Sequence, residues 1–144
     1  MRISTKGRYS LEALLYMALF PEGEFTSART IAESINMSDG YLEQLFIPLR
    51  KAGIIQGVRG PQGGYHPTRS IDKIKVGDVL RAVEGTLQPT ECAVDTNICP
   101  VRDICTSRHT WRDLYAAIID CVDSISLKDL VDAYYAADRI EYTI

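Results

Sequence analysis

The sequence predicts a mainly α-helical fold that contains one β-hairpin, and three observations support this prediction. Apolar residues recur at helical spacing over residues 8–20. The apolar segments 54–58 and 65–67 flank a tip rich in glycine and proline, which is typical of a two-stranded hairpin. A longer apolar stripe at helical spacing begins near residue 110 and predicts a long C-terminal helix. Short helices followed by a hairpin are the order of a winged helix-turn-helix domain.

The first two helices precede the hairpin. The first is expected over residues 8–20, because Pro21 cannot continue it. Thr26 or Ser27 is placed to cap a second, short helix, since a hydroxyl in that position accepts a hydrogen bond from a free backbone N–H of the first turn. This second helix is expected to reach about Asn36.

The third helix is predicted to begin at Ser38, whose hydroxyl is a good N-cap, with Asp39 at the positive end of the helix dipole. Its expected span is residues 38–47. Pro48 lacks a backbone N–H, so we expect a kink or a break there. Gly53 then predicts a left-handed cap before the hairpin.

The segment after the hairpin is expected to hold a helix from about Val76 to Val83, which stops at Gly85. Residues 86–106 predict an irregular loop, which is too long to be idle in a compact domain.

A long helix is predicted from about Thr110, and a capping box of Ser126 and Asp129 begins a last helix that reaches about Ala137. The apolar stripe of the long helix is wider than one small core requires. We therefore interpret it as a dimerisation helix that packs against its symmetry mate, with packing on its own domain as the alternative. The stripe consists of Trp111, Leu114, Tyr115, Ile118, Cys121, Val122 and Ile125.

Length and composition are those of a soluble globular chain, with 144 residues of which 46% are hydrophobic and 24% charged. We expect a winged helix-turn-helix domain over residues 1–85, a loop over 86–109, and the dimerisation and last helices over 110–144. The apolar run 14–20 is too short to cross a bilayer, which takes about 20 residues, and no signal peptide is evident. A cytoplasmic protein without a membrane partner is therefore expected.

Charge is distributed unevenly along the chain. Residues 1–75 hold ten Lys and Arg against seven Asp and Glu, a net charge of +3, whereas residues 76–144 hold six against twelve, a net charge of −6. A basic half joined to an acidic half favours a polyanionic partner for one face. A random surface distribution is the alternative.

In a helix-turn-helix the second helix of the motif enters the major groove. Here that helix offers hydroxyl and amide groups for phosphate or base contacts from Ser38, Tyr41 and Gln44. Glu43 either accepts from cytosine N4 or opposes binding and so tunes which sites are accepted. The alternative for each of these residues is a solvated helix face.

The hairpin tip is a second candidate DNA contact. Arg59 can enter a narrow minor groove, where the potential is most negative, and Gly60 lets the backbone approach closely. Phosphate contacts, which set register without reading sequence, are expected from Lys6, Arg8, Arg50 and Lys51.

Three of the four cysteines, Cys92, Cys99 and Cys105, lie in the irregular loop at spacings that differ from a zinc ribbon. Thiolates favour zinc, copper(I) or iron–sulfur clusters, and iron–sulfur clusters usually take four protein ligands. His109 is the nearest imidazole for the fourth position; Cys121, a loop carboxylate or a partner-chain residue could replace it. Reactive thiols without metal are the alternative.

Several segments of the chain together resemble the IscR group of bacterial repressors. The segments are RISTKGRY at residues 2–9, YLEQLF at 41–46, RGPQGGY at 59–65, VGDV at 76–79 and WRDL at 111–114. The resemblance implies a dimeric winged-helix repressor of iron–sulfur biogenesis genes that binds double-stranded DNA at a pseudo-palindromic operator. It also implies that the three loop cysteines hold a 2Fe–2S cluster whose state controls DNA binding.

The chain departs from the IscR pattern at one position. That pattern places a ligand histidine three residues before the tryptophan, where this chain has Arg108, and His109 follows one residue later. One residue turns a helix by about 100°, so His109 is displaced around the helix from the expected direction. His109 is kept as the expected fourth ligand.

We therefore expect a DNA-binding regulator and not an enzyme, because His66 and His109 have no evident nucleophile partner. Three alternatives stay open. The first is a nitric-oxide-responsive or redox- or cysteine-responsive repressor of the same superfamily, which includes the NsrR and CymR types. The second is a zinc-stabilised DNA-binding protein, and the third is a small iron–sulfur electron carrier.

Overall fold

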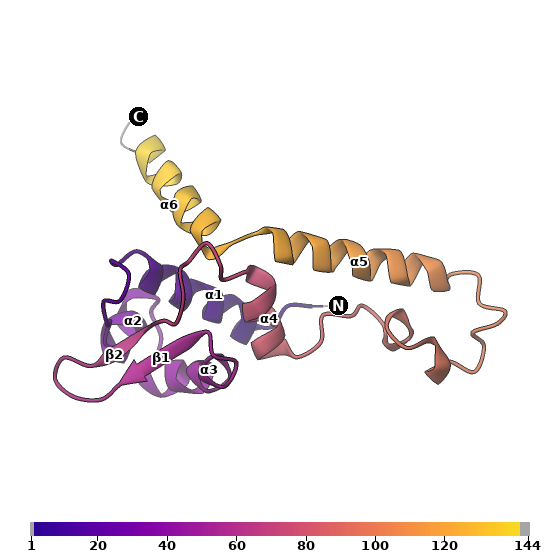
Figure 1. Ribbon diagram of the computed structural model, residues 1–144, viewed down its shortest axis with the longest axis horizontal. Helices are drawn as coiled ribbons and strands as arrows, with labels where there is room; N and C mark the ends of the chain where they lie inside the picture. The colour runs from indigo at the N-terminus through magenta and orange to yellow at the C-terminus, as the bar shows by residue number, and fades with distance from the viewer. Residues whose placement is uncertain (1, 142–144) are drawn as a thin grey trace.

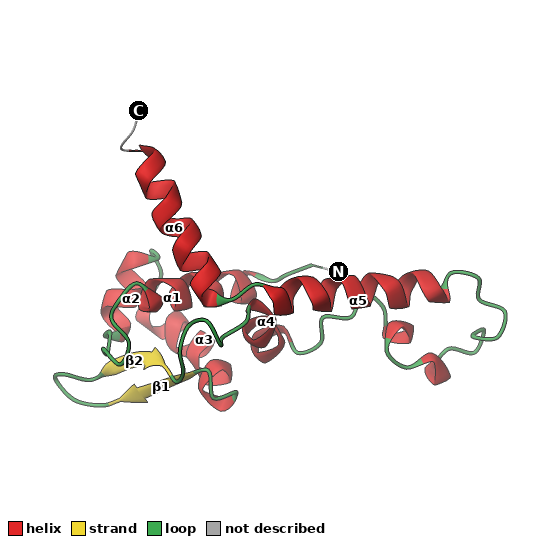
Figure 2. Ribbon diagram, turned by 45° about the horizontal axis from the view of Figure 1, so that its top comes forward, coloured by secondary structure: helices red, strands yellow, loops and turns green. Residues whose placement is uncertain are grey.

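The computed structural model describes residues 2–141 and shows a helical body from which two helices extend (Figure 1). Figure 2 shows the same chain by secondary structure, with one small sheet among helices. The elements in chain order are α1 (Thr5–Ala18), α2 (Ala28–Ser34), α3 (Asp39–Lys51), β1 (Ile55–Val58), β2 (Gly64–Pro67), α4 (Val76–Glu84), α5 (Arg108–Ser124) and α6 (Leu127–Glu141). This order confirms the predicted mainly α-helical winged helix-turn-helix.

Serine hydroxyls cap the N-terminal ends of the first two helices. The Gly7 backbone N–H donates to Ser4 Oγ over 3.3 Å, so α1 begins three residues before the predicted start. The Thr30 N–H donates to Ser27 Oγ over 3.1 Å, which confirms the predicted cap of α2.

The third helix begins as predicted but passes through Pro48. The Tyr41 N–H donates to Ser38 Oγ over 3.2 Å. Of the predicted kink or break at Pro48, the break is wrong, because α3 continues to Lys51. Proline removes one hydrogen bond, but Leu45, Phe46 and Leu49 are fully buried around it, and their packing keeps the last turn helical.

The hairpin is antiparallel, in a register that pairs Ile55 with Pro67 and Val58 with Gly64. Its second strand also pairs with the turn before α2: Tyr65 N–H donates to the Thr26 carbonyl over 2.8 Å, and Thr26 N–H donates back over 3.0 Å. Gly64 has a φ of +149°, and a Cβ there would overlap the Thr26 carbonyl. Only glycine therefore lets the β1–β2 hairpin, which is the wing of the winged helix-turn-helix, lie this close to the helical body.

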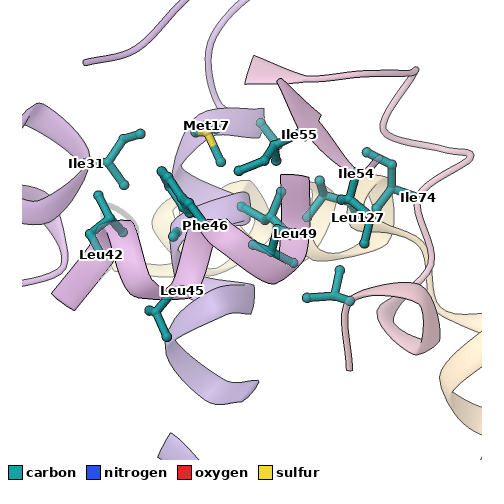
Figure 3. Close-up of a cluster of buried hydrophobic side chains, with 14 of the residues drawn as sticks. Met17, Ile31, Leu42, Leu45, Phe46, Leu49, Ile54, Ile55, Ile74 and Leu127 are labelled. Atoms are coloured by element: carbon teal, nitrogen blue, oxygen red, sulfur yellow. The ribbon is translucent and has the colours of Figure 1, made fainter. Parts of the chain in front are cut away.

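The hydrophobic core lies between α1, α2, α3 and the sheet, and α6 completes it (Figure 3). Leu127 and Val131 of α6 belong to the same cluster as Phe46 and Ile74. The Leu127 N–H also donates to the Ile74 carbonyl over 2.8 Å. The start of the C-terminal helix is thus part of the body that carries the wing.

The last two helices differ in how they are held. Helix α5, whose residues 108–124 all lie within the described part of the chain, has no buried residue. The predicted capping box of α6 is confirmed, since Ser126 N–H donates to Asp129 Oδ2 over 2.7 Å and Asp129 N–H donates to Ser126 Oγ over 3.1 Å. The loop before α5 is irregular, as predicted, apart from two short 3₁₀ turns, Glu91–Ala93 and Thr96–Ile98.

Candidate nucleic-acid interface and cysteine loop

The apolar face of α3 packs into the core and leaves its polar face outside. Leu42, Leu45, Phe46 and Leu49 have no exposed surface. The predicted DNA-contacting residues Ser38, Glu43, Gln44 and Arg50 are exposed, and Tyr41 is half-buried. The helix thus presents hydroxyl, amide, carboxylate and guanidinium groups to solvent on one face, as a major-groove helix requires.

Tyr65 joins α3 to the hairpin, a contact that the spacing of the residues did not indicate. Its ring lies 4.7 Å from the Phe46 ring between centroids, and the Arg50 guanidinium lies over it at 5.9 Å. Gly57 faces Tyr65 across the hairpin, where a Cβ would come 2.7 Å from the tyrosine ring. Arg50 is therefore held at the boundary between α3 and the hairpin.

The remaining predicted DNA contacts lie at the wing tip and on the first turns of α1. Arg59 and Gly60 are exposed at the tip, where Gly60 has a φ of +119°. Lys6 and Arg8 are exposed on α1. The start of α1 is fastened by Ser4, whose N–H and hydroxyl both donate to Glu84 Oε1, over 2.8 and 2.6 Å.

Three of the predicted metal-ligating residues border one hollow in the loop. Cys92, Cys99 and Cys105 line one small hollow, together with Arg102 and Arg108. All four cysteines of the chain, each within the described part, are free thiols. The three loop cysteines thus border one hollow, and their role as metal ligands stays a prediction.

The fourth predicted ligand lies outside that hollow. His109 is exposed and does not line it, whereas Arg108 does. Within residues 2–141, no three His, Cys, Asp or Glu side chains are gathered into a group that could hold a metal ion. The donor chemistry of three thiols fits zinc or an iron–sulfur cluster, but the lining supplies no fourth ligand.

The electrostatics of the hollow favour thiolate at one position. Hydrogen bonds from the Ser107 hydroxyl, 3.5 Å from Cys105 Sγ, and from the Ser107 backbone N–H lower the pKa of the Cys105 thiol. The Arg108 guanidinium acts in the same direction. Thiolate is the form that both binds metal and reacts with oxidants.

A second, apolar hollow lies between α4, α5 and the N-terminal segment. It measures about 350 Å³ and is lined by Ile3, Leu80, Leu87, Ala117, Ile118, Cys121 and Val122. Cys121 therefore lies in this apolar hollow and not with the loop cysteines.

Of the helices that the structure describes, none has the length and apolar character needed to span a membrane.

Comparison with known proteins gives the family. Residues 3–133 match the family model Rrf2, described as an iron-dependent transcriptional regulator. The IscR regulator of Pectobacterium carotovorum is 39% identical over 132 residues, which cover 92% of this chain and 80% of the relative. The chain belongs to the Rrf2 family. As an Rrf2 protein it is a helix-turn-helix transcriptional regulator, in a family whose members bind DNA and are not enzymes.

Solved structures support the Rrf2 fold. CymR, described as the global cysteine regulator of Bacillus subtilis, superposes with a TM-score of 0.77 at 36% identity, over 92% of this chain and 98% of CymR. IscR of T. potens superposes with a TM-score of 0.75 at 34% identity, over 95% of this chain and 90% of that protein. This Rrf2 chain is therefore similar both to cysteine-regulator and to IscR members.

Proposed function

We propose that this Rrf2 protein is a homodimeric repressor that senses iron–sulfur status through a 2Fe–2S cluster and controls iron–sulfur biogenesis genes. The observation that carries the proposal is the convergence of Cys92, Cys99 and Cys105 on one hollow. These three residues would hold the cluster, and His109, which lies outside the hollow in this structure, is the proposed fourth ligand. A bound cluster would cross-link the loop, and the presence of the cluster would depend on iron supply and redox state.

The DNA interface follows from the polar face of α3 and the wing. We propose that Ser38, Tyr41, Glu43 and Gln44 face the major groove and that Arg59 and Gly60 approach the minor groove. Lys6, Arg8 and Arg50 would contact phosphates. Because this partner is DNA, we propose that the protein acts in the cytoplasm.

Homodimerisation is proposed through α5. No residue of this helix is buried, and Leu114 is 42% exposed. The apolar hollow beside α5 is open to a second copy, and burial of such a surface is the main driving force of association. A two-fold dimer presents two α3 helices, so a pseudo-palindromic operator is the matching DNA.

The test is an anaerobic absorption spectrum, with iron, acid-labile sulfide and zinc assays on freshly purified protein. We expect charge-transfer bands with iron and sulfide for the wild type and for Cys121→Ser, whose thiol lies in the apolar hollow. Cys99→Ser is expected to lose both the bands and the iron. Stoichiometric zinc without iron would instead identify a zinc-stabilised DNA-binding protein.

The second candidate is a repressor that responds to oxidants, nitric oxide or cysteine through metal-free thiols. Two observations favour it: the lowered pKa of the Cys105 thiol and the similarity to CymR. A colourless protein that takes up neither iron nor zinc, and whose DNA affinity changes on mild oxidation only while Cys105 is present, would establish this function over the first.

A further inference from the structure

An ion pair fastens the C-terminal end of α5 to α4. Arg81 Nη2 lies 2.6 Å from Asp123 Oδ1, and Arg81 Nη1 lies 3.4 Å from Asp123 Oδ2. The hydrogen bond to Asp123 raises the pKa of Arg81, whose guanidinium is charged at physiological pH in any case. Two parallel contacts fix the direction of both side chains as well as their separation.

A second ion pair extends this connection toward the wing. Arg81 Nη2 lies 3.6 Å from Asp78 Oδ1, and the other oxygen of Asp78 accepts a hydrogen bond from Arg69 Nη2 over 3.3 Å. Arg69 lies two residues after the end of β2. Alternating charges therefore run from the base of the wing across α4 to α5.

Close packing surrounds the Arg81–Asp123 pair. A Cβ at Gly77 would overlap Asp123 Oδ1 and come 3.0 Å from Val122 Cγ2. The Val76 N–H, next in the chain, donates to the Ile125 carbonyl over 2.9 Å. The end of α5 is thus held at a narrow joint, while the rest of the helix extends away from the α3 and wing side of the body (Figures 1 and 2).

We infer that Arg81 and Asp123 are positioning residues for operator binding, because they set the angle between α5 and the winged-helix body. This inference rests on the proposed homodimer through α5. In such a dimer, the angle at each joint determines the distance and twist between the two α3 helices. The half-site spacing that the dimer accepts follows from that distance and twist.

The experiment compares three DNA probes in titrations with the full chain. The first is a two-half-site duplex selected from random-sequence DNA with the wild-type protein; the second carries one extra base pair between the half-sites, and the third is a single half-site. One base pair rotates the half-sites by about 35° relative to each other. The insertion penalty is the factor by which affinity falls from the first duplex to the second. We expect a penalty for the wild-type protein, and a penalty about threefold smaller for Asp123→Asn, which is the size of effect that removal of a partly exposed ion pair allows.

Two further variants separate positioning from general stability. Arg81→Lys keeps the charge but loses the second contact, so its insertion penalty is expected between those of the wild type and Asp123→Asn. Lys128→Gln breaks a 2.6 Å ion pair to Asp132 that lies within α6 alone, and its penalty is expected to equal the wild-type value. All three variants are expected to bind the single half-site as the wild type does.

Two results would overturn the inference. One is an unchanged insertion penalty in Asp123→Asn; the other is an equal loss of affinity for the half-site and the full operator, which shows that the pair only stabilises the body. A wild-type chain that is monomeric in solution, or that has no insertion penalty, contradicts the proposed homodimer itself. That failure is thereby distinguished from a failure at the joint.

Discussion

The winged-helix body and the α5 region are built in opposite ways. The body is closed by its own side chains, and residues such as Phe46, Leu42 and Ile31 have no exposed surface. In α5 no residue is buried, and the loop before it exposes large apolar side chains. These are Val94, Ile98, Val101 and Ile104. The body therefore buries its core within the chain, whereas the loop and α5 leave much of their apolar surface uncovered.

The largest expected effect tests this contrast by removing one apolar side chain from each region. Phe46→Ala removes a fully buried ring and is expected to lower the free energy of unfolding by about 3–5 kcal/mol. Ile104→Ala removes a side chain that is 79% exposed and should change it by no more than about 0.5 kcal/mol. Urea unfolding of the metal-free protein measures both. Similar losses in the two variants would show that the loop also packs against the body.

The next effect sharpens the comparison within the body, at the wing. Gly64→Ala places a Cβ onto the Thr26 carbonyl at a φ of +149° and is expected to cost about 1–3 kcal/mol. Gly23→Ala is the matched control, because its φ is +82° but nothing lies within 4 Å of its Cβ. Gly64→Ala should therefore lower the free energy of unfolding more than Gly23→Ala does, and should also weaken operator binding. Equal losses of stability in the two variants would mean that a small shift relieves the overlap with Thr26.

A third prediction separates function from stability. Arg59→Ala at the exposed wing tip should weaken operator affinity by about tenfold and leave the thermal midpoint unchanged. Lys128→Ala removes a positive charge at the start of α6, outside the proposed DNA contacts, and should change affinity little. Fluorescence anisotropy with labelled operator at fixed salt compares the two. An equal loss in both variants would indicate that only net charge matters at this interface.

The smallest effect concerns the junction between the two regions. Hydrogen bonds from the Ser126 backbone N–H, and then from its hydroxyl, lower the pKa of Asp129. A lowered folded-state pKa adds stability above the unfolded pKa of about 3.9, and this stability is lost as pH falls through the folded-state value. The stability difference between wild type and Asp129→Asn should therefore be present at pH 6 and shrink on acidification below about pH 4. A difference that stays constant with pH would show that ionisation of the Asp129 carboxyl does not contribute to it.

Local features of this fold were predictable from sequence. The caps at Ser27, Ser38 and Ser126 depend on side chains within three residues of the groups they bind, and each was found as predicted. The hairpin likewise follows from turn residues next to apolar strands. Such interactions are encoded over a few positions, so spacing alone identifies them.

Features that depend on distant residues were not predictable in the same way. The continuation of α3 through Pro48 is decided by core packing that the sequence pattern does not display. Arg81 and Asp123 are separated by 42 residues, and nothing in their spacing indicates that they meet. In the cysteine loop, the three thiols are close in sequence and line one hollow, but the direction of His109 depends on where α5 begins.

The place of Leu127 and Val131 in the hydrophobic core has a consequence for biosynthesis. The other members of that cluster lie between residues 13 and 79, and these leave the ribosome well before the last helix is made. A nascent chain that stops inside α5 therefore has a wing and a recognition helix but an unfinished core. Since domains fold as cooperative units, the DNA-binding body reaches its full stability only after the start of α6 has been made and has packed onto the core.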